Sequence, residues 1–281
     1  MPLNRRSFLK LVGATIATYG LAGVGGYYYS TQLEPHRLVV EPVQVPIAKL
    51  KPALEGFRLV QLSDIHLHPY TQIALVQEAV TVVNTLQPDL IVLTGDYVLQ
   101  GAESIFELAP VLASLNAKYG VFAVLGNHDL WTDAAVVRAG LAQAGMPVLW
   151  NQGLTLGIGQ ATIYLAGLDD VWSGQPDLKS ALVGATPDTP TILLAHEPDF
   201  ADLTALDGRV DLQLSGHSHG GQVRLPGLGA PVLPYLGQKY DQGLRRVNQV
   251  WVYTNRGLGV IPPPVRLNCP PEITEITLIG V

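Results

Sequence analysis

Cysteine is almost absent from the sequence: Cys269 is the single cysteine among 281 residues. One thiol excludes an internal disulfide framework and a thiolate-bound metal cluster, although it says little about the compartment. Charge is also scarce, because charged residues make up 14% of the chain and the formal net charge is −6. A nucleic-acid-binding protein would usually carry a basic stripe, so we expect no nucleic-acid partner.

Apolar residues, in contrast, are plentiful, at 48% of the chain. That share excludes a disordered chain and indicates a globular or membrane-associated protein. The length suffices for one large domain or two small ones with a substantial buried core.

The N-terminus combines basic residues with an uncharged stretch. Arg5, Arg6 and Lys10 precede residues 11–29, which carry no charge. This order is typical of a targeting signal, and adjacent arginines followed by Ser-Phe-Leu-Lys resemble the twin-arginine export signal. An ordinary membrane anchor of about 20 residues is the alternative. We favour a twin-arginine signal that spans residues 1–31. Whether this segment is removed or stays as an anchor is open.

A twin-arginine signal has consequences for partners and location. It predicts the twin-arginine export machinery as a partner, because that receptor reads the motif. The protein would then lie outside the cytoplasm, in the periplasm or cell envelope, and residues 11–29 could hold it in the membrane.

Prolines mark the next segment, residues 32–54. Pro42 and Pro46 interrupt an alternating apolar pattern, which suits a connector leading into an edge strand, where proline is tolerated. We expect the main folded domain to span residues 55–281.

From residue 57 onward, strand-like and helix-like patterns alternate. Strands are expected at 57–63, 89–94 and 121–125, and amphipathic helices at 71–86, 103–118 and 132–144. This rhythm indicates a mostly parallel sheet that is buried on both faces.

After Pro147 the pattern changes to short strands and glycine-rich turns. The additional strands are expected at 154–158, 162–166, 191–195, 211–215, 249–254 and 272–279. Residues 220–243 are rich in loop-forming residues. One α/β domain with two sheets is the simplest interpretation.

Potential metal ligands follow these strands directly. The candidates are Asp64, His66, Asp96, Asn127, His196, His217 and His219. Because open α/β sheets build their sites at the carboxyl ends of strands, we expect these side chains to converge. We interpret them as a two-metal hydrolase site.

The chemistry of this ligand set favours phosphate. Asp96 is the natural bridging carboxylate, since a shared carboxylate holds two dications about 3.5–4 Å apart. Two dications with Asp64 and Asp96 keep a charge of about +2, which attracts phosphate and lowers the pKa of a bound water. Mixed nitrogen and oxygen ligands suit Mn, Fe or Zn without selecting one.

His128 is the candidate for proton transfer. It follows the proposed ligand Asn127 and precedes Asp129. A histidine oriented by a carboxylate can protonate a leaving oxygen, so we assign that role to His128 with Asp129 as its partner.

The motifs together resemble one family. DIH at 64–66, GD at 95–96, GNHD at 126–129, HEPD at 196–199 and GHSH at 216–219 resemble the calcineurin-like metallophosphoesterases, specifically the YkuE/YaeI-type phosphodiesterase branch. The resemblance implies an α/β fold, a four-layer α/β/β/α sandwich of two mixed β-sheets. It also implies that Asp64, His66, Asp96 and His219 hold one divalent ion, and Asp96, Asn127, His196 and His217 the other.

The resemblance further implies a phosphodiesterase whose substrate is an envelope or lipid-linked phosphoester. One alternative is a UDP-2,3-diacylglucosamine pyrophosphatase of lipid A synthesis, which export would disfavour because that substrate is made on the cytoplasmic side. Another alternative is a metal-binding scaffold that has lost catalysis.

Four positions have open or unusual roles. Leu99 stands where the family often has Asp, so altered loop anchoring is expected there. Arg256 could contact phosphate or cap a strand end, and Trp131 and Trp172 could line a groove, although packing is the default for both.

Overall fold

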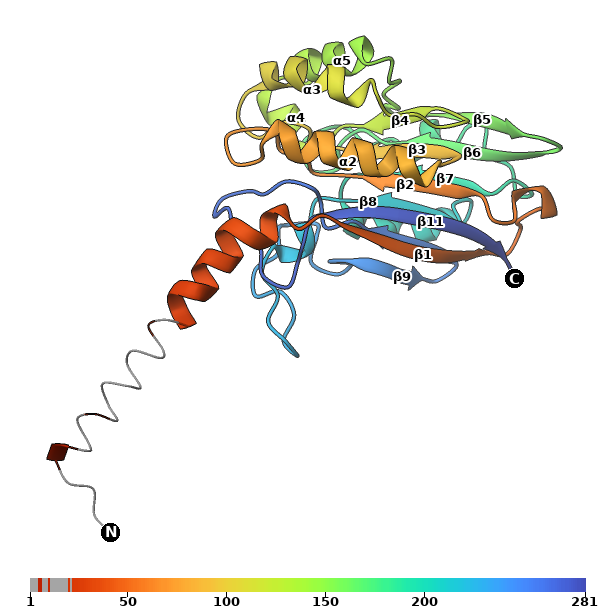
Figure 1. Ribbon diagram of the computed structural model, residues 1–281. Helices are drawn as coiled ribbons and strands as arrows, with labels where there is room; N and C mark the ends of the chain where they lie inside the picture. Colours follow the sequence, from red (N-terminus) through yellow and green to blue (C-terminus); the bar gives the residue numbers. More distant parts are fainter. Residues whose placement is uncertain (1–4, 7–9, 11–19, 21) are drawn as a thin grey trace.

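Two β-sheets pack face to face in this computed structural model, with helices on both outer faces (Figure 1). The structure describes residues 5, 6, 10, 20 and 22–281. The first sheet has the order β1-β11-β2-β3-β4, with bounds β1 Val39–Ile47, β11 Glu272–Gly280, β2 Arg58–Leu62, β3 Leu90–Thr94 and β4 Val121–Val124. The second has the order β5-β6-β7-β8-β10-β9, with bounds β5 Gln152–Ile158, β6 Ala161–Gly167, β7 Thr191–Leu194, β8 Leu212–Ser215, β10 Val250–Thr254 and β9 Gly243–Val247.

Helices complete the outer layers. Four helices cover the first sheet: α2 Ile73–Leu86, α3 Ile105–Leu112, α4 Asn127–Thr132 and α5 Ala134–Gln143. Helices α6 Leu178–Ala181 and α7 Ala201–Asp207 belong to the second half of the chain.

Both sheets are mixed. Strands β2, β3 and β4 are parallel, whereas β11 runs antiparallel to β2. In the second sheet β6, β7, β8 and β10 are parallel, and the edge strands β5 and β9 are antiparallel to their neighbours. The predicted fold class, a four-layer sandwich of two mixed sheets, is confirmed.

Three apolar clusters lie between the four layers. Val76 of α2 packs with Ile91 of β3 in the first cluster. Val92 of β3 and Leu165 of β6 both belong to the second, between the sheets. Leu193 of β7 packs with α7 in the third. Strands buried on both faces explain the continuous apolar runs in the sequence.

Strand β1 is an edge strand and carries Pro42 and Pro46. It pairs in parallel with β11 over nine residues, from Val39 to Ile47. Proline is tolerated there because the outer side of an edge strand needs no donor. The first sheet therefore begins within residues 32–54, the segment expected to hold a connector and an edge strand.

Some elements differ from the sequence expectation. The helix expected over 103–118 ends at Leu112, since Asn84 supplies side-chain partners to the backbone of Ser114 and Asn116. Asp133 caps α5 by accepting hydrogen bonds from the backbone N–H groups of Ala135 and Val136, which separates α5 from α4. Strand β9 and helix α7 were not predicted.

The described N-terminal residues form a helical segment attached to the body. Residues 22–28 are helical, Tyr29–Leu33 forms a wider turn and Glu34–His36 a tight one. The carbonyl of Ser30 accepts a hydrogen bond from the Arg266 backbone at 2.9 Å. Within the described residues, no helix combines the length and the apolar character that crossing a membrane requires. Most of the expected twin-arginine motif and uncharged stretch lies outside the described residues.

Candidate metal centre

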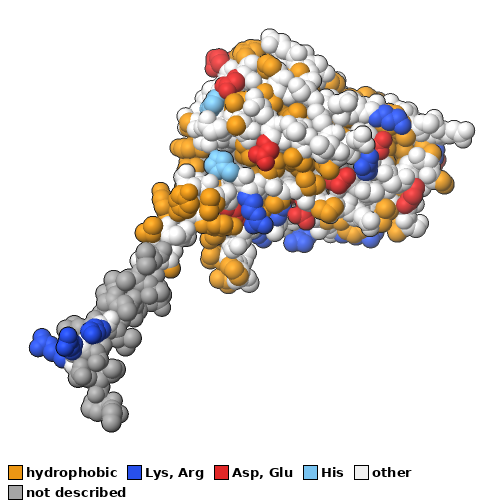
Figure 2. Space-filling model, viewed as in Figure 1, with side chains coloured by type: hydrophobic (Ala, Val, Ile, Leu, Met, Phe, Trp, Pro, Cys, Tyr) orange, Lys and Arg blue, Asp and Glu red, His pale blue; other side chains and the backbone are white. Residues whose placement is uncertain are grey.

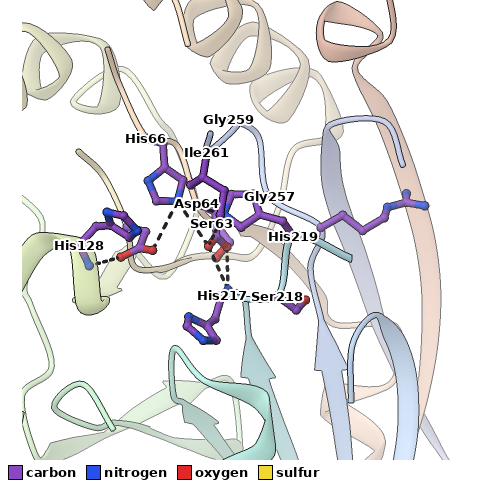
Figure 3. A network of polar contacts seen from close by, with 12 residues as sticks. Ser63, Asp64, His66, His128, His217, Ser218, His219, Gly257, Gly259 and Ile261 are labelled. Carbon is purple, nitrogen blue, oxygen red and sulfur yellow. Dashed lines mark hydrogen bonds and ion pairs between the residues drawn. The ribbon is translucent and has the colours of Figure 1, made fainter. Parts of the chain in front are cut away.

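All seven predicted ligands lie at one edge of the sandwich, where strands of both sheets end. Asp64 and His66 follow β2, Asp96 follows β3, Asn127 follows β4, His196 follows β7, and His217 and His219 follow β8. Each of the seven side chains is buried. Figure 3 shows the His66 ring beside the Asp64 carboxylate, which accepts the backbone N–H of His217.

One group of side chains surrounds Asp64. The Nε2 atoms of His66 and His219 lie 3.0 Å apart. Nε2 of His219 lies 3.3 Å from Oδ1 of Asp64, and Nε2 of His66 lies 3.4 Å from Oδ2 of Asp96. Potential donor atoms of Asp64, His66 and His219 all lie within 4.8 Å of one another.

A second group surrounds Asp96. Its Oδ2 lies 3.1 Å from Nε2 of His196, and Nδ1 of His217 lies 3.0 Å from Oδ1 of Asn127. Asp64, Asp96 and His196 form another set of donors within 4.8 Å. Asp96 thus lies next to histidines of both groups, the position that a bridging carboxylate requires.

The donor set fits divalent cations. Nε2 of His196 is buried without a hydrogen-bond partner, and buried polar atoms are normally satisfied. Burial lowers the pKa of His66 to about 3 and that of His217 to about 4. Both imidazoles are therefore neutral, which is the form that binds a metal ion.

Two backbone carbonyls fix the histidine rings. Nδ1 of His196 donates to the carbonyl of Thr94 at 2.6 Å, and Nε2 of His217 donates to the carbonyl of Tyr235 at 2.7 Å. A carbonyl can only accept, so these nitrogens carry the protons and the opposite ring nitrogens face the cluster. Such outer hydrogen bonds orient metal-binding histidines.

The backbone at the site is strained. Five of the seven side chains come from residues in the left-handed region, with φ between 46° and 68°: Asp64, His66, Asp96, His217 and His219. This conformation costs about 1–2 kcal/mol for a residue with a Cβ atom. Strain that the surrounding structure maintains is characteristic of functional sites.

Asp129 differs from its predicted role. Its Oδ2 accepts the backbone N–H groups of Asp96 and Gly126, and its Oδ1 accepts that of Tyr97. Nδ1 of His128 instead lies 3.4 Å from the carbonyl of Leu99. The expected pairing of Asp129 with the His128 ring is wrong, because the buried carboxylate satisfies the turn that carries Asp96.

His128 itself lies beside the cluster. Its backbone N–H donates to Oδ1 of Asp96 at 2.9 Å, and its ring meets that of His66 edge-on with centroids 4.7 Å apart. The side chain is partly exposed, so it can reach both the ligands and a substrate. The Leu99 carbonyl provides the loop contact of this ring.

Exposed aromatic rings line the mouth of the site. Trp131 contacts His128, Trp172 contacts Trp131, and Tyr235 contacts Trp172, with ring centroids 4.8, 5.0 and 5.7 Å apart. Trp131 is 52% exposed and Trp172 41%. Both tryptophans therefore pack against neighbouring rings at the surface, where they form an aromatic rim with Tyr235.

Two acidic residues hold the loops of this rim. Glu197 accepts the backbone N–H groups of Val171 and Trp172, and Asp199 accepts those of residues 238–240, just beyond Tyr235. The sequence analysis missed these anchoring roles. The signal that could have found them is the HEPD motif, which places both carboxylates within three residues of the ligand His196.

Arg256 is occupied by structural contacts. Its guanidinium lies 3.1 Å from Glu41 and 2.6 Å from Glu272, so the strand-end alternative describes it better than phosphate binding. The hydroxyl of Tyr97 donates to the carbonyl of Val124 in the core.

The four-layer fold and this buried cluster of histidine, aspartate and asparagine define a class of metal-dependent hydrolases. A family model described as calcineurin-like phosphoesterase matches residues 57–221. The chain belongs to this family and is a phosphoester hydrolase, as the motifs predicted.

Similar proteins support this assignment along the whole chain. The uncharacterized metallophosphoesterase YkuE of Bacillus subtilis (strain 168) is 36% identical over 283 residues, which cover 98% of each chain. Phosphodiesterase YaeI of Escherichia coli (strain K12) is 34% identical, over 99% of this chain and 100% of its own. The solved structure of TT1561 from Thermus thermophilus shares the fold, with a TM-score of 0.50 and 13% identity over 72% of this chain and 90% of its own.

Proposed function

We propose that the chain is a phosphodiesterase that uses two divalent metal ions, of Mn, Zn or Fe, at the cell envelope. The position of Asp96 between two groups of histidines carries this proposal, because it suits a shared carboxylate. The similarity to phosphodiesterase YaeI supports diesters as substrates. Bound ions would supply positive charge for the phosphate and activate a water molecule near neutral pH.

The residues of the site have different proposed roles in metal binding, proton transfer and anchoring. Asp64, His66, Asp96 and His219 would hold one ion, and Asp96, Asn127, His196 and His217 the other. As an imidazolium, His128 would donate its Nδ1–H to the carbonyl of Leu99 and its Nε2 proton to the leaving oxygen. Asp129 keeps the turn of Asp96 in place and takes no direct part.

The envelope location is proposed from the N-terminal sequence. Arg5 and Arg6 followed by Ser-Phe-Leu-Lys support recognition by the twin-arginine export machinery. We propose that residues 11–29 then either leave with the signal or hold the enzyme in the membrane. Its substrate would be an envelope or lipid-linked phosphodiester.

A pyrophosphatase is the second candidate. The UDP-2,3-diacylglucosamine pyrophosphatase LpxG of Chlamydia muridarum is 30% identical over 93% of this chain and 96% of its own. Release of the acylated sugar phosphate from the UDP-linked lipid would favour this candidate. Export from the cytoplasm would count against it.

Purified full-length protein, depleted of metal and then supplied with Mn²⁺, tests the main proposal. We expect faster turnover of bis-p-nitrophenyl phosphate than of p-nitrophenyl phosphate, and little activity for Asp96→Asn. Absence of hydrolysis of both compounds, with metal shown to be bound, would favour a catalytically silent scaffold.

A further inference from the structure

Three uncharged segments meet at the base of the N-terminal helix. They are residues 22–33, 225–238 and 257–265, and none contains Asp, Glu, Lys or Arg. We propose that they form one docking face for a phospholipid bilayer, which we name the apolar face. Figure 2 shows apolar side chains gathered around the helix base and over the loop that projects beside it.

The apolar face exposes large side chains that a soluble surface would normally bury. Leu228 is 82% exposed, Val232 75% and Tyr27 71%, and Pro262 and Pro263 are exposed as well. Single exposed apolar residues need no explanation, but a continuous patch indicates an interaction site.

Hydrogen bonds of the adjoining residues Gln222 and Arg266 connect the three segments. The side chain of Gln222, just before the projecting loop, donates to the carbonyls of Ile261 and Pro263 and accepts the Ile261 N–H. The Arg266 backbone N–H donates to the carbonyl of Ser30 in the helical segment. A cavity of about 330 Å³ between the helix and residues 258–260 completes the contact region.

The sequence beyond the helix favours lipid over a protein partner. The helical segment continues an uncharged stretch from residue 11, and Tyr27, Tyr28 and Tyr29 lie at its end. Tyrosine at this position is typical of the boundary between the apolar core of a bilayer and water. The projecting loop lies on the side of the body from which the helix departs (Figure 1).

A chain of hydrogen bonds connects the apolar face to the metal centre. Glu34, at the helix base, accepts the backbone N–H of Cys269, whose thiol donates to the carbonyl of His219. Docking would therefore hold the candidate metal centre near the lipid surface. This consequence rests on the proposed function and makes diesters presented by a bilayer the preferred substrate class.

An environment-sensitive fluorophore on Leu228→Cys of the full-length protein tests the docking. Val281→Cys is the matched control: it is another exposed aliphatic position, one residue beyond β11, whose nine residues span about 30 Å. The native Cys269 is buried and should not react.

In vesicles of phosphatidylcholine and phosphatidylglycerol, we expect a blue shift and quenching by spin-labelled lipid at position 228 and neither effect at position 281. Solvent-like emission at position 228 in vesicle-bound protein would overturn the proposal. A blue shift that lipid does not quench and that grows with protein concentration would also overturn it, in favour of a second copy or another protein.

Activity measurements on soluble and vesicle-borne diesters distinguish a failure of bilayer docking from a failure of the proposed phosphodiesterase. The double variant Leu228→Ser/Val232→Ser should hydrolyse soluble bis-p-nitrophenyl phosphate normally and a vesicle-borne p-nitrophenyl phospholipid about tenfold more slowly. Equal rates of wild type and variant on the vesicle substrate would overturn the substrate preference. Quenching at position 228 without hydrolysis of any diester would support docking and refute the phosphodiesterase.

Discussion

The Nε2 atoms of His66 and His219 lie 3.0 Å apart although the residues are 153 positions apart in the sequence. Two buried imidazoles at this distance, beside Asp64 and Asp96, have a natural common partner in a divalent cation. A ligand that binds only the native state stabilises it, by about 2.7 kcal/mol at a hundredfold excess over Kd.

We therefore expect Mn²⁺ to raise the thermal unfolding temperature of metal-depleted protein. His219→Gln should show a smaller shift, whereas His68→Gln should keep it, because His68 contacts the exposed Glu107 outside the cluster. Calorimetry with and without Mn²⁺ measures both. An undiminished shift in His219→Gln would remove that residue from the ligand set.

His128→Gln should lower turnover without reducing metal binding. The ring lies beside His66 and next to the Leu99 carbonyl, and general acid catalysis contributes roughly 10²–10⁴-fold. We expect kcat to fall within that range while the metal content, measured by elemental analysis, stays at the wild-type level. If kcat were unchanged, another group would have to protonate the leaving oxygen.

Asp129→Asn tests the anchoring of the bridging residue. Both oxygens of Asp129 accept backbone N–H groups in the turns of Asp96 and Gly126, whereas the amide of Asn would direct N–H groups toward one of those donors. An unpaired buried donor costs about 1–3 kcal/mol, so the free energy of unfolding in urea should fall by about that amount.

Asp133→Asn is the matched control for this change. Asp133 caps α5 at the surface, and Asn is about as good a cap, so little stability should be lost. Equal effects of the two substitutions would contradict the special role of Asp129.

The sequence predicted the parts of the site that depend on local pattern. Apolar runs located β2, β3, β4, β7 and β8 to within about two residues, because buried strands must be apolar on both faces. The ends of those strands then placed the ligands. The direction of the Asp129 carboxylate could not be predicted, since neighbouring residues in sequence can point to different partners.

Two further features depend on tertiary structure. The left-handed backbone of His66 and His219 cannot be predicted from residue type, because it is uncommon for every residue that has a Cβ atom. The aromatic rim likewise joins Trp131, Trp172 and Tyr235 from three separate loops, and a loop sequence does not specify where its side chains meet.

Gly216→Ala should damage the metal centre through crowding alone. A Cβ atom at this position would lie 1.9 Å from Oγ of Ser63 and 2.1 Å from Oδ2 of Asp64, so Asp64 would have to move. We expect weaker Mn²⁺ binding in a titration followed by calorimetry.

Gly157→Ala provides the control for Gly216→Ala. Gly157 lies in β5, and a Cβ atom there would meet no other heavy atom within 4 Å. Its Mn²⁺ affinity should equal that of the wild type. Unchanged affinity in Gly216→Ala would show that the Asp64 carboxylate tolerates displacement.

Trp172→Ala should reduce the affinity of the site for ligands that carry a ring. Trp172 contacts both His217 and Tyr235 in the rim, and an aromatic pair contributes about 0.5–1.5 kcal/mol beyond the area it buries. The ratio of the inhibition constants of phenylphosphonate and methylphosphonate measures the contribution of the ring contact, because both compounds present the same phosphonate to the metal site. We expect the preference for the phenyl compound to fall by about two- to tenfold in Trp172→Ala.

Phe106→Ala, which removes an aromatic ring of equal 41% exposure from α3, should leave the preference unchanged. The same ratio of constants in Trp172→Ala and wild type would mean that the rim does not contact the ester group of the substrate.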